Sequence, residues 1–494
     1  MKSKKNKVHS PSRRKFLQGA AATTAGVMIV PRHVIGGPGY KAPSDTLNIA
    51  GVGVGGMGHN NLNNMATENI VALCDTYWDY AKKSFDKYPK AKQFKDYRVM
   101  LDQMGKDIDA VMVATPDHTH ALVAVDSMLL GKHVYVQKPL THSVYESRTL
   151  RLVAKRMGVA TQMGNQGNSG DGIRQICEWI WNGEIGEVKE VHAWTNRPVW
   201  PQGMNKPTGK AKIPKSLDWD LFIGPAQYRD FHPLYQPWNW RGWWDYGTGA
   251  LGDMACHIMD PAFKAMRFGH PYAVEATSTE FNIHSAPQSE VVTYYFPARD
   301  NLPKVAFPEA TFTWYDGGIM PPRPAELEQG KQMGDGGGGV LFVGSKGKLI
   351  CSTYARNPYI IGREEVNVPQ TLRRVKDGIG GHEQDWIRAC KEPKETRIEA
   401  SSNFDYAGPL NEVVVMGNLG VRLQGLQKRL LWDGENMRFT NINDNEEITA
   451  ITNNVFTMEN DKPQFNRDRI TLNAKQLAEE LVKHNYREGW KLSE

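Results

Sequence analysis

The sequence contains little cysteine, and none of it is spaced to bind a metal. Its five cysteines form an odd number without a C-x-x-C pair: Cys74, Cys177, Cys256, Cys351 and Cys390. This pattern indicates neither a disulfide framework nor a zinc site. We therefore expect five thiols in the protein core and predict no metal site.

Long apolar runs are also missing. The most suggestive run, residues 19–30, consists of small uncharged residues and is shorter than the roughly 20 apolar residues that a membrane span needs. It follows Ser12-Arg13-Arg14-Lys15-Phe16-Leu17, which is typical of a twin-arginine export signal. We predict a signal segment over residues 1–35 and export of the folded protein to the periplasm. No clear cleavage site is visible, so retention of the segment as a membrane anchor stays open.

An excess of positive charge is absent once this leader is set aside. The formal net charge is +6, and seven basic residues lie among the first fifteen positions without an acid, so +6 minus 7 leaves −1 for the rest. A chain without a net positive field or a concentrated basic patch is not typical of nucleic-acid binding. We predict no nucleic-acid partner.

Glycine, in contrast, is concentrated after the first apolar segment. Residues 47–52 predict a strand, a glycine turn and a helix follow, and a second strand, 70–74, ends at Asp75. This is the dinucleotide-binding fingerprint, in which backbone N–H groups at a helix N-terminus face a pyrophosphate. Two registers fit, Gly51/Gly53/Gly56 and Gly53/Gly55/Gly58. We choose the second, because it leaves a complete strand and starts the helix near His59. The cofactor contacts predicted from this turn are Gly53, Gly55, Gly56, Met57 and Gly58.

Asp75 lies 22 residues beyond Gly53. A carboxylate there can accept hydrogen bonds from both ribose hydroxyls of an adenosine and would repel a 2′-phosphate. NAD is therefore favoured over NADP, although Lys82 and Lys83 could soften this repulsion.

Two further segments end in polar residues. Residues 109–114 predict a buried strand that ends in Thr115-Pro116-Asp117-His118-Thr119-His120, and the strand 133–136 ends in Gln137-Lys138-Pro139. Alternation of strands with helices predicts a parallel, doubly wound sheet, whose ligands bind at the carboxyl ends of the strands. We expect additional cofactor contacts from Thr115, Pro116, His118, His120, Gln137, Lys138 and Asn165.

Together these segments resemble the Gfo/Idh/MocA oxidoreductase family. The resemblance rests on the glycine turn, the Thr115-Pro116 segment with its two histidines, the Lys138-Pro139 pair and a fourth segment, residues 249–260, similar to that family's active-site helix. One departure is Gln137, where the family usually has Glu. The resemblance implies a second α+β domain with an open, mainly antiparallel sheet.

Asp253 and His257 are spaced to share one face of the fourth segment's helix. A carboxylate within reach of an imidazole orients the ring and favours its protonated form, which suits a general base. The alternative is a surface pair or a core histidine. The resemblance implies that His257 accepts the hydroxyl proton, Lys138 holds the substrate oxygen and Asp253 orients both.

Tryptophan is clustered, with seven of the fourteen lying between Trp194 and Trp244. Aromatic faces mixed with polar groups suit sugar rings, whose C–H faces stack. The alternative is that these rings pack a long loop onto the sheet. We predict Trp243, Trp244 and Tyr246 as walls of the substrate site.

The sequence thus predicts an α/β protein with a nucleotide domain at 46–165, a substrate domain at 166–430 and an extension at 431–494 that is helical near 472–484. We expect an exported, homo-oligomeric NAD-dependent oxidoreductase acting on a carbohydrate or polyol. The alternative is a glycoside hydrolase or lyase that keeps and recycles its NAD. A sugar-binding protein without catalysis is disfavoured, because Lys138, Asp253 and His257 are all present.

Overall fold

The computed structural model describes residues 45–494, and its first sheet has six parallel strands in the order β3-β2-β1-β4-β5-β6. These strands are β1 (Asn48–Val52), β2 (Asn69–Cys74), β3 (Lys92–Phe94), β4 (Ala110–Val113), β5 (His133–Val136) and β6 (Thr161–Met163). This order reverses at β1, which makes the carboxyl ends of β1 and β4 the crevice where a dinucleotide binds. Every residue of β4 is buried, as expected for a parallel strand covered on both faces.

Helices connect these strands and are capped by residues visible in the sequence. They are α3 (Gly56–Asn64), α4 (Trp78–Lys87), α5 (Tyr97–Met104), α6 (Asp117–Leu129) and α7 (Val144–Met157). Asp96 caps α5, while Ser143 and Glu146 form a reciprocal capping box on α7. Gly158 ends α7 in the left-handed conformation.

The second sheet has nine strands in the order β15-β14-β13-β7-β12-β9-β8-β16-β17. They are β7 (Val188–Thr195), β8 (Ala273–Ser278), β9 (Glu290–Phe296), β12 (Ala310–Tyr315), β13 (Gly338–Gly344), β14 (Gly347–Ser352), β15 (Tyr359–Ile360), β16 (Leu430–Asp433) and β17 (Arg438–Phe439). Only β7 and β12 pair in parallel. A separate hairpin joins β10 (Arg299–Leu302) to β11 (Val305–Phe307). The predicted fold class is confirmed, although the extension expected from residue 431 begins inside this sheet.

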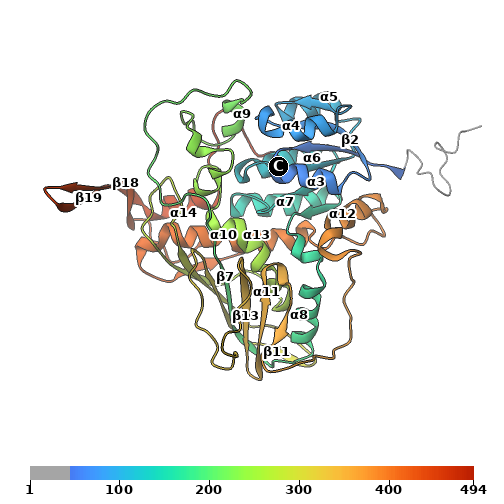
Figure 1. Cartoon of the computed structure of the whole chain (residues 1–494), viewed down its shortest axis with the longest axis vertical. Coiled ribbons are helices and arrows are strands. Elements are labelled where there is room, and N and C mark those ends of the chain that lie inside the picture. Colours follow the sequence, from blue (N-terminus) through green and yellow to red (C-terminus); the bar gives the residue numbers. More distant parts are fainter. Residues whose placement is uncertain (1–44) are drawn as a thin grey trace, which may run out of the picture. The chain divides into compact units, whose positions relative to one another are not determined.

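Helices α10 (Gly249–Ile258) and α13 (Phe404–Leu423) lie between the two sheets (Figure 1). The other α-helices between β6 and β16 in the chain are α8 (Asp171–Trp181), α9 (Trp219–Ile223), α11 (Asp260–Ala265) and α12 (His382–Lys391). Asn411 of α13 accepts a hydrogen bond from the backbone N–H of Leu140 at 2.9 Å and donates one to the Thr141 hydroxyl at 3.0 Å. A buried amide of α13 therefore fixes the turn that follows Lys138 and Pro139.

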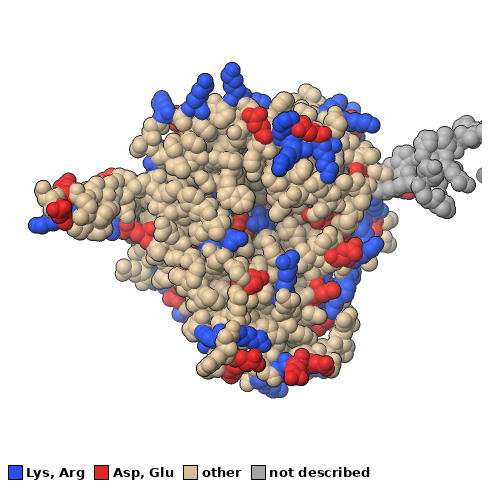
Figure 2. Space-filling view, in the orientation of Figure 1, with Lys and Arg blue, Asp and Glu red and all other residues tan. Residues whose placement is uncertain are grey.

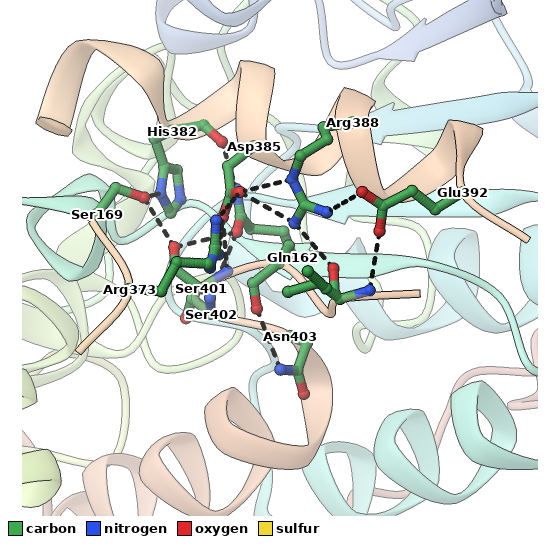
Figure 3. A network of polar contacts seen from close by, with 12 residues as sticks. Gln162, Ser169, Arg373, His382, Asp385, Arg388, Glu392, Ser401, Ser402 and Asn403 are labelled. Carbon is green, nitrogen blue, oxygen red and sulfur yellow. Dashed lines mark hydrogen bonds and ion pairs between the residues drawn. The ribbon is translucent and has the colours of Figure 1, made fainter. Parts of the chain in front are cut away.

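A polar network attaches α12 to the edge of the first sheet (Figure 3). Gln162 of β6 donates to the backbone oxygen of His382, whose ring lies 2.7 Å from the Ser169 hydroxyl. Asp385 accepts from the guanidinium groups of Arg373 and Arg388. Segments more than 200 residues apart in sequence thus complete the nucleotide domain.

The tail differs from the sequence prediction. It is helical at α14 (Ala474–Val482), but β18 (Glu447–Glu459) and β19 (Lys462–Asn473) form a long hairpin that we did not predict. The turn residues Asn460 and Asp461 both have positive φ, at 50° and 59°, as a type I′ hairpin turn requires. The hairpin projects from the rest of the fold (Figure 1) and exposes Phe456 and Phe465.

All five cysteines are buried free thiols, as expected. Within residues 45–494 no helix is both long and apolar enough to cross a membrane, and no cluster of His, Cys, Asp or Glu is arranged to hold a metal. Acidic and basic side chains are interspersed on the face drawn in Figure 2. The predicted signal segment, 1–35, lies outside the described residues.

Candidate functional site

The glycine turn has backbone positions that exclude side chains. Gly53 has a φ of +76°, and a Cβ there would lie 2.6 Å from the backbone of Ala114 at the end of β4. A Cβ on Gly58 would lie 1.9 Å from the Gly53 carbonyl oxygen. These close approaches follow the Gly53/Gly55/Gly58 register, with α3 beginning at Gly56, three residues before His59. The N-terminus of α3 therefore opens toward the crevice, with the Tyr80 ring packed against Gly55 and Gly56.

Asp75 accepts hydrogen bonds from the backbone of the same turn. Its Oδ2 accepts hydrogen bonds from the backbone N–H groups of Val54 at 2.9 Å and Gly55 at 3.1 Å, and its Oδ1 accepts one from Tyr77 at 2.8 Å. Burial raises the pKa of this carboxyl to about 6, against these three hydrogen bonds, which lower it. Oδ1 retains one lone pair, whereas both lone pairs of Oδ2 are used, so the group can still accept one hydrogen bond from a ribose.

A cavity of about 580 Å³ extends from this turn to α10. The predicted residues that line it are Gly53, Gly55, Gly56, Met57, Asp75, Thr115, Pro116, Gln137, Lys138, Asp253 and His257. The predicted residues that are not among its lining are Gly58, His118, His120, Asn165, Trp243, Trp244 and Tyr246. The structure thus brings the three strand-end segments and the α10 pair to one space.

Lys138 and Asp253 meet directly across the domain boundary. The Lys138 ammonium donates to Oδ1 of Asp253 at 2.9 Å and to its backbone oxygen at 2.7 Å, and Arg241 Nε donates to the same Oδ1 at 2.9 Å. Burial would raise the pKa of Asp253, but the charges and hydrogen bonds of Lys138 and Arg241 hold it well below its usual range. Asp253 is thus a permanently ionised anchor that fixes the Lys138 ammonium in the cavity.

His257 differs from the sequence expectation. Its pKa lies well below 6.5, because burial and the nearby Lys138 charge outweigh the effect of Asp253. Asp253 does raise the pKa of the ring, as we expected, but the expected protonated form is wrong, because burial and the Lys138 charge have the larger effect. His257 packs edge-on against Tyr354 with ring centroids 4.6 Å apart, and its Nδ1 is buried without a hydrogen-bond partner. A neutral imidazole beside the cavity is already in the form that accepts a proton.

His118 and His120 are structural in this arrangement, contrary to their predicted contact with the cofactor. The His118 ring lies between the backbone oxygens of Phe222 and Tyr246, at 3.0 and 3.3 Å. The His120 ring lies 2.8 Å from the backbone oxygens of both Thr115 and Pro139. Burial lowers the pKa to about 3 for His118 and about 4 for His120. His120 therefore joins the two strand-end turns from behind.

Gln137 and Asn165 are both held by buried polar groups. Gln137 donates to the Asn61 side chain at 2.9 Å, and Asn61 donates to Glu383 of α12 at 2.7 Å. The family usually has a carboxylate at position 137. Here the carboxylate is Glu383 of α12, and the Asn61 amide links it to Gln137. Asn165 donates to Asp260 at 3.0 Å and is turned away from the cavity lining.

The predicted tryptophan walls are wrong, and other rings take their place. Trp243 and Tyr246 are buried in an aromatic cluster under the loop, where their side chains cannot reach the cavity, and Trp244 packs beside Arg422. Trp200, Trp238 and Trp240 line the cavity instead. They surround the Arg241 guanidinium, whose carbon lies 4.1 Å from the Trp238 ring centroid and 4.3 Å from that of Trp240.

Sequence reasoning also missed Tyr80, Arg241, Tyr354 and Trp490, all of which line the cavity. Arg241 lies within the tryptophan-rich segment that precedes α10, and a single cation among these rings was the available sequence signal. Tyr354 adopts a positive φ of 62° in a short turn that no local pattern marks.

Two family models match consecutive parts of the chain. Residues 47–165 match the Gfo/Idh/MocA oxidoreductase family, NAD-binding Rossmann fold, and residues 185–288 match the C-terminal alpha/beta domain of that family. The prediction of an NAD-binding nucleotide domain is thereby confirmed.

The curated relatives include two kinds of enzyme. An inositol 2-dehydrogenase of Salmonella typhimurium is 30% identical over 153 residues, which is 30% of this chain and 45% of the relative. An alpha-N-acetylgalactosaminidase of Shewanella oneidensis is 27% identical over 208 residues, which is 37% of this chain and 45% of the relative. The chain thus spans about half the length of the curated relatives that it matches.

Solved structures share the fold at low identity. The WlbA dehydrogenase of Bordetella pertussis, in complex with NADH and UDP-GlcNAcA, has a TM-score of 0.53 at 17% identity and covers 78% of this chain and 99% of its own. A levoglucosan dehydrogenase complexed with NADH has a TM-score of 0.50 at 16% identity and covers 77% and 97%.

Proposed function

For a chain whose two domains belong to the Gfo/Idh/MocA oxidoreductase family and whose Rossmann domain binds NAD, we propose oxidation of a sugar or polyol hydroxyl. The observation that carries this proposal is the joint presence of Lys138, Asp253 and neutral His257 in the cavity that begins at the glycine turn. The curated relatives, an inositol 2-dehydrogenase and an alpha-N-acetylgalactosaminidase, support a polyol or sugar as the substrate class.

The residues present fit the dinucleotide. The Gly53 and Gly58 positions have no room for side chains, the α3 N-terminus faces the crevice, and Oδ1 of Asp75, at the end of β2, has one lone pair left. Gly53, Gly55 and Gly56 would hold the pyrophosphate, and Asp75 the adenosine ribose. When bound, NAD supplies the acceptor for the hydride.

The chain's own residues supply proton transfer and positioning. Nδ1 of His257 is fully buried, which leaves Nε2 as the ring nitrogen for the cavity; Nε2 takes the hydroxyl proton as the carbinol C–H leaves as hydride. The Lys138 ammonium uses two of its donors on Asp253 and directs the third to the substrate oxygen. Its positive charge stabilises the alkoxide character that develops during transfer.

Redox-neutral cleavage of a glycoside is the second candidate function. It is compatible with the 27% identity to an alpha-N-acetylgalactosaminidase and would use the same groups, with NAD regenerated within each turnover. Such an enzyme needs no free NAD pool, which suits a protein outside the cytoplasm.

One experiment separates the two functions. The purified protein is incubated with a panel of polyols and glycosides, while mass spectrometry follows the substrate and absorbance follows NADH. Oxidation predicts a ketone formed in proportion to NADH or to an added acceptor. Free sugar without net NADH, together with solvent deuterium at the carbon beside the oxidised one, would support the glycosidase. Neither product with any member of the panel would contradict both.

We also propose export through the twin-arginine signal at residues 12–17. Membrane retention and a homo-oligomeric state stay predictions, which fractionation and sedimentation of the native protein would test.

A further inference from the structure

The last part of the chain, residues 483–494, folds back over the nucleotide domain, and the C-terminus lies beside α6 (Figure 1). Tyr486 donates to Glu146 of α7 at 2.6 Å, and Ser493 donates to Asp126 of α6 at 2.9 Å. Between them, the Arg487 side chain donates to the backbone oxygen of Gly224, which follows α9, at 3.0 Å. The segment is thus attached to three helices, one of which belongs to the aromatic loop.

These attachments place Trp490 in the wall of the NAD cavity. Arg98, at the start of α5, lies with its guanidinium carbon 4.1 Å from the Trp490 ring centroid. Arg98 is itself fixed by a two-point contact with Asp96, at 3.0 and 2.7 Å. The indole is therefore held from outside by a cation whose own position is set by the cap of α5.

The position of Trp490 identifies the end of the cavity to which it belongs. Lys95 and Asp96, which follow β3, and Thr119 and Val123 of α6 also line the cavity. Arg98, which contacts the indole, lies two residues after Asp96, and a Cβ on Gly224 would lie 3.7 Å from Trp490 and 3.1 Å from Thr119. In this sheet order the acid after β2, here Asp75, binds the adenosine ribose. The space beyond that acid, between the end of β3 and α6, is where the adenine ring must lie. Lys138 and His257 belong to the opposite, nicotinamide end.

We propose that Trp490 stacks against the adenine of bound NAD and closes the adenosine end of the site. An indole gives a flat apolar surface that matches a purine, and α6 contributes the aliphatic Val123. The tail is thus part of the cofactor site. This inference goes beyond the sugar chemistry and does not depend on it.

The competing interpretation is that Trp490 only attaches the tail, through Arg98. The two interpretations predict different effects of removing the Trp490 side chain on the binding of the two halves of the dinucleotide. Loss of stacking weakens ligands that contain adenine and leaves nicotinamide mononucleotide unaffected. A general loosening of the domain weakens both halves together.

The test measures the dissociation constants of ADP-ribose and of nicotinamide mononucleotide for the full-length protein after removal of bound nucleotide. In Trp490→Ala the Kd of ADP-ribose should rise about tenfold, as expected for loss of one base–aromatic stack. The Kd of nicotinamide mononucleotide should stay within about twofold. Trp490→Phe should restore most of the ADP-ribose affinity, because it keeps an aromatic face. Lys491→Ala, an exposed neighbour in the same tail, is the matched control and should behave as wild type.

A second readout is the rate at which NAD leaves the purified holoprotein, which should rise in Trp490→Ala and not in Lys491→Ala. Should Trp490→Ala fail to fold, Trp490→Leu keeps an apolar filling and should still lose ADP-ribose affinity. An unchanged Kd of ADP-ribose in a folded variant without the indole, or equal weakening of both half-ligands, would overturn the proposal. Failure of the sugar oxidation assay would leave these outcomes unaffected.

Discussion

The affinity for NAD should fall in mildly acidic solution, because Asp75 must be ionised to accept a ribose hydroxyl at Oδ1 while it accepts three backbone N–H groups. Burial raises its pKa to about 6, whereas an unfolded aspartate titrates at 3.8. Only the ionised fraction is competent, and the apparent Kd is the intrinsic Kd divided by that fraction. With a pKa of about 6 the ionised fraction is about 0.9 at pH 7 and about 0.1 at pH 5, so the Kd should rise about tenfold.

In the nucleotide-free protein, the contribution of Asp75 to folding stability changes with pH in the opposite direction to NAD affinity. Because the folded pKa lies above the unfolded one, Asp75 contributes most stability below pH 3.8 and loses it as pH rises through about 6. A shift of about two units corresponds to about 3 kcal/mol. Bound NAD should restore part of the stability lost on ionisation, because a ribose hydroxyl stabilises the Asp75 carboxylate. Binding near pH 6 should therefore release a proton from Asp75.

Titration calorimetry from pH 5 to pH 8, in buffers with different ionisation enthalpies, measures both the Kd and the released proton. Asp117 and Glu146 also have pKa values raised to about 7, so Asp75→Asn is the required control. It should bind NAD more weakly, with a flatter pH profile and a smaller preference over NADP. A wild-type Kd that does not change between pH 5 and pH 7, or an unchanged slope in Asp75→Asn, would refute the assigned role.

Three further results are expected. His257→Ala should keep bound NAD but lower turnover by roughly 10² to 10⁴, the range for a positioned acid–base group, and near-normal kcat would return this histidine to a structural role. Trp243→Ala should lower the free energy of unfolding by roughly 3–5 kcal/mol, as for a buried aromatic side chain. Trp238→Ala, at a ring that is 48% exposed, should instead raise KM with little change in thermal stability. The opposite pattern would contradict the corrected assignment of the cavity walls. Replacing Arg13 and Arg14 together with lysine should keep the folded protein in the cytoplasm, and undiminished export of this variant on cell fractionation would exclude the twin-arginine proposal.

The nucleotide domain could be predicted because its signals are local. The β4 strand is a run of buried apolar residues, and after β1 the positive φ of Gly53 and the contact of Gly58 with the Gly53 carbonyl oxygen are features of one βα turn. The convergence of Thr115 and Lys138 then follows from the parallel sheet alone. The Lys138–Asp253 contact crosses domains and could be expected only through the family resemblance.

The remaining errors concern residues whose surroundings come from distant segments. Trp243 and Trp238 lie in the same aromatic stretch, yet one is 1% exposed and the other 48%, because the loop folds on itself before it reaches the cavity. The neutral form of His257 follows from its burial and from the Lys138 charge, and helical spacing reveals neither of them. The β18–β19 hairpin did have a local signal, the Asn460-Asp461 turn directly after a strand rich in isoleucine, threonine and valine.

The return of α12 and residues 483–494 to the first sheet affects the order of events during synthesis. Strands β1 to β6 leave the ribosome more than 200 residues before α12, which supplies Glu383, and still earlier than Trp490. Until then the edge at β6 lacks its cover, and the adenosine end of the cavity lacks one wall. Stable capture of the cofactor is therefore expected only after α12 and residues 483–494 have been synthesised, and a protein exported in the folded state would leave the cytoplasm only after that step.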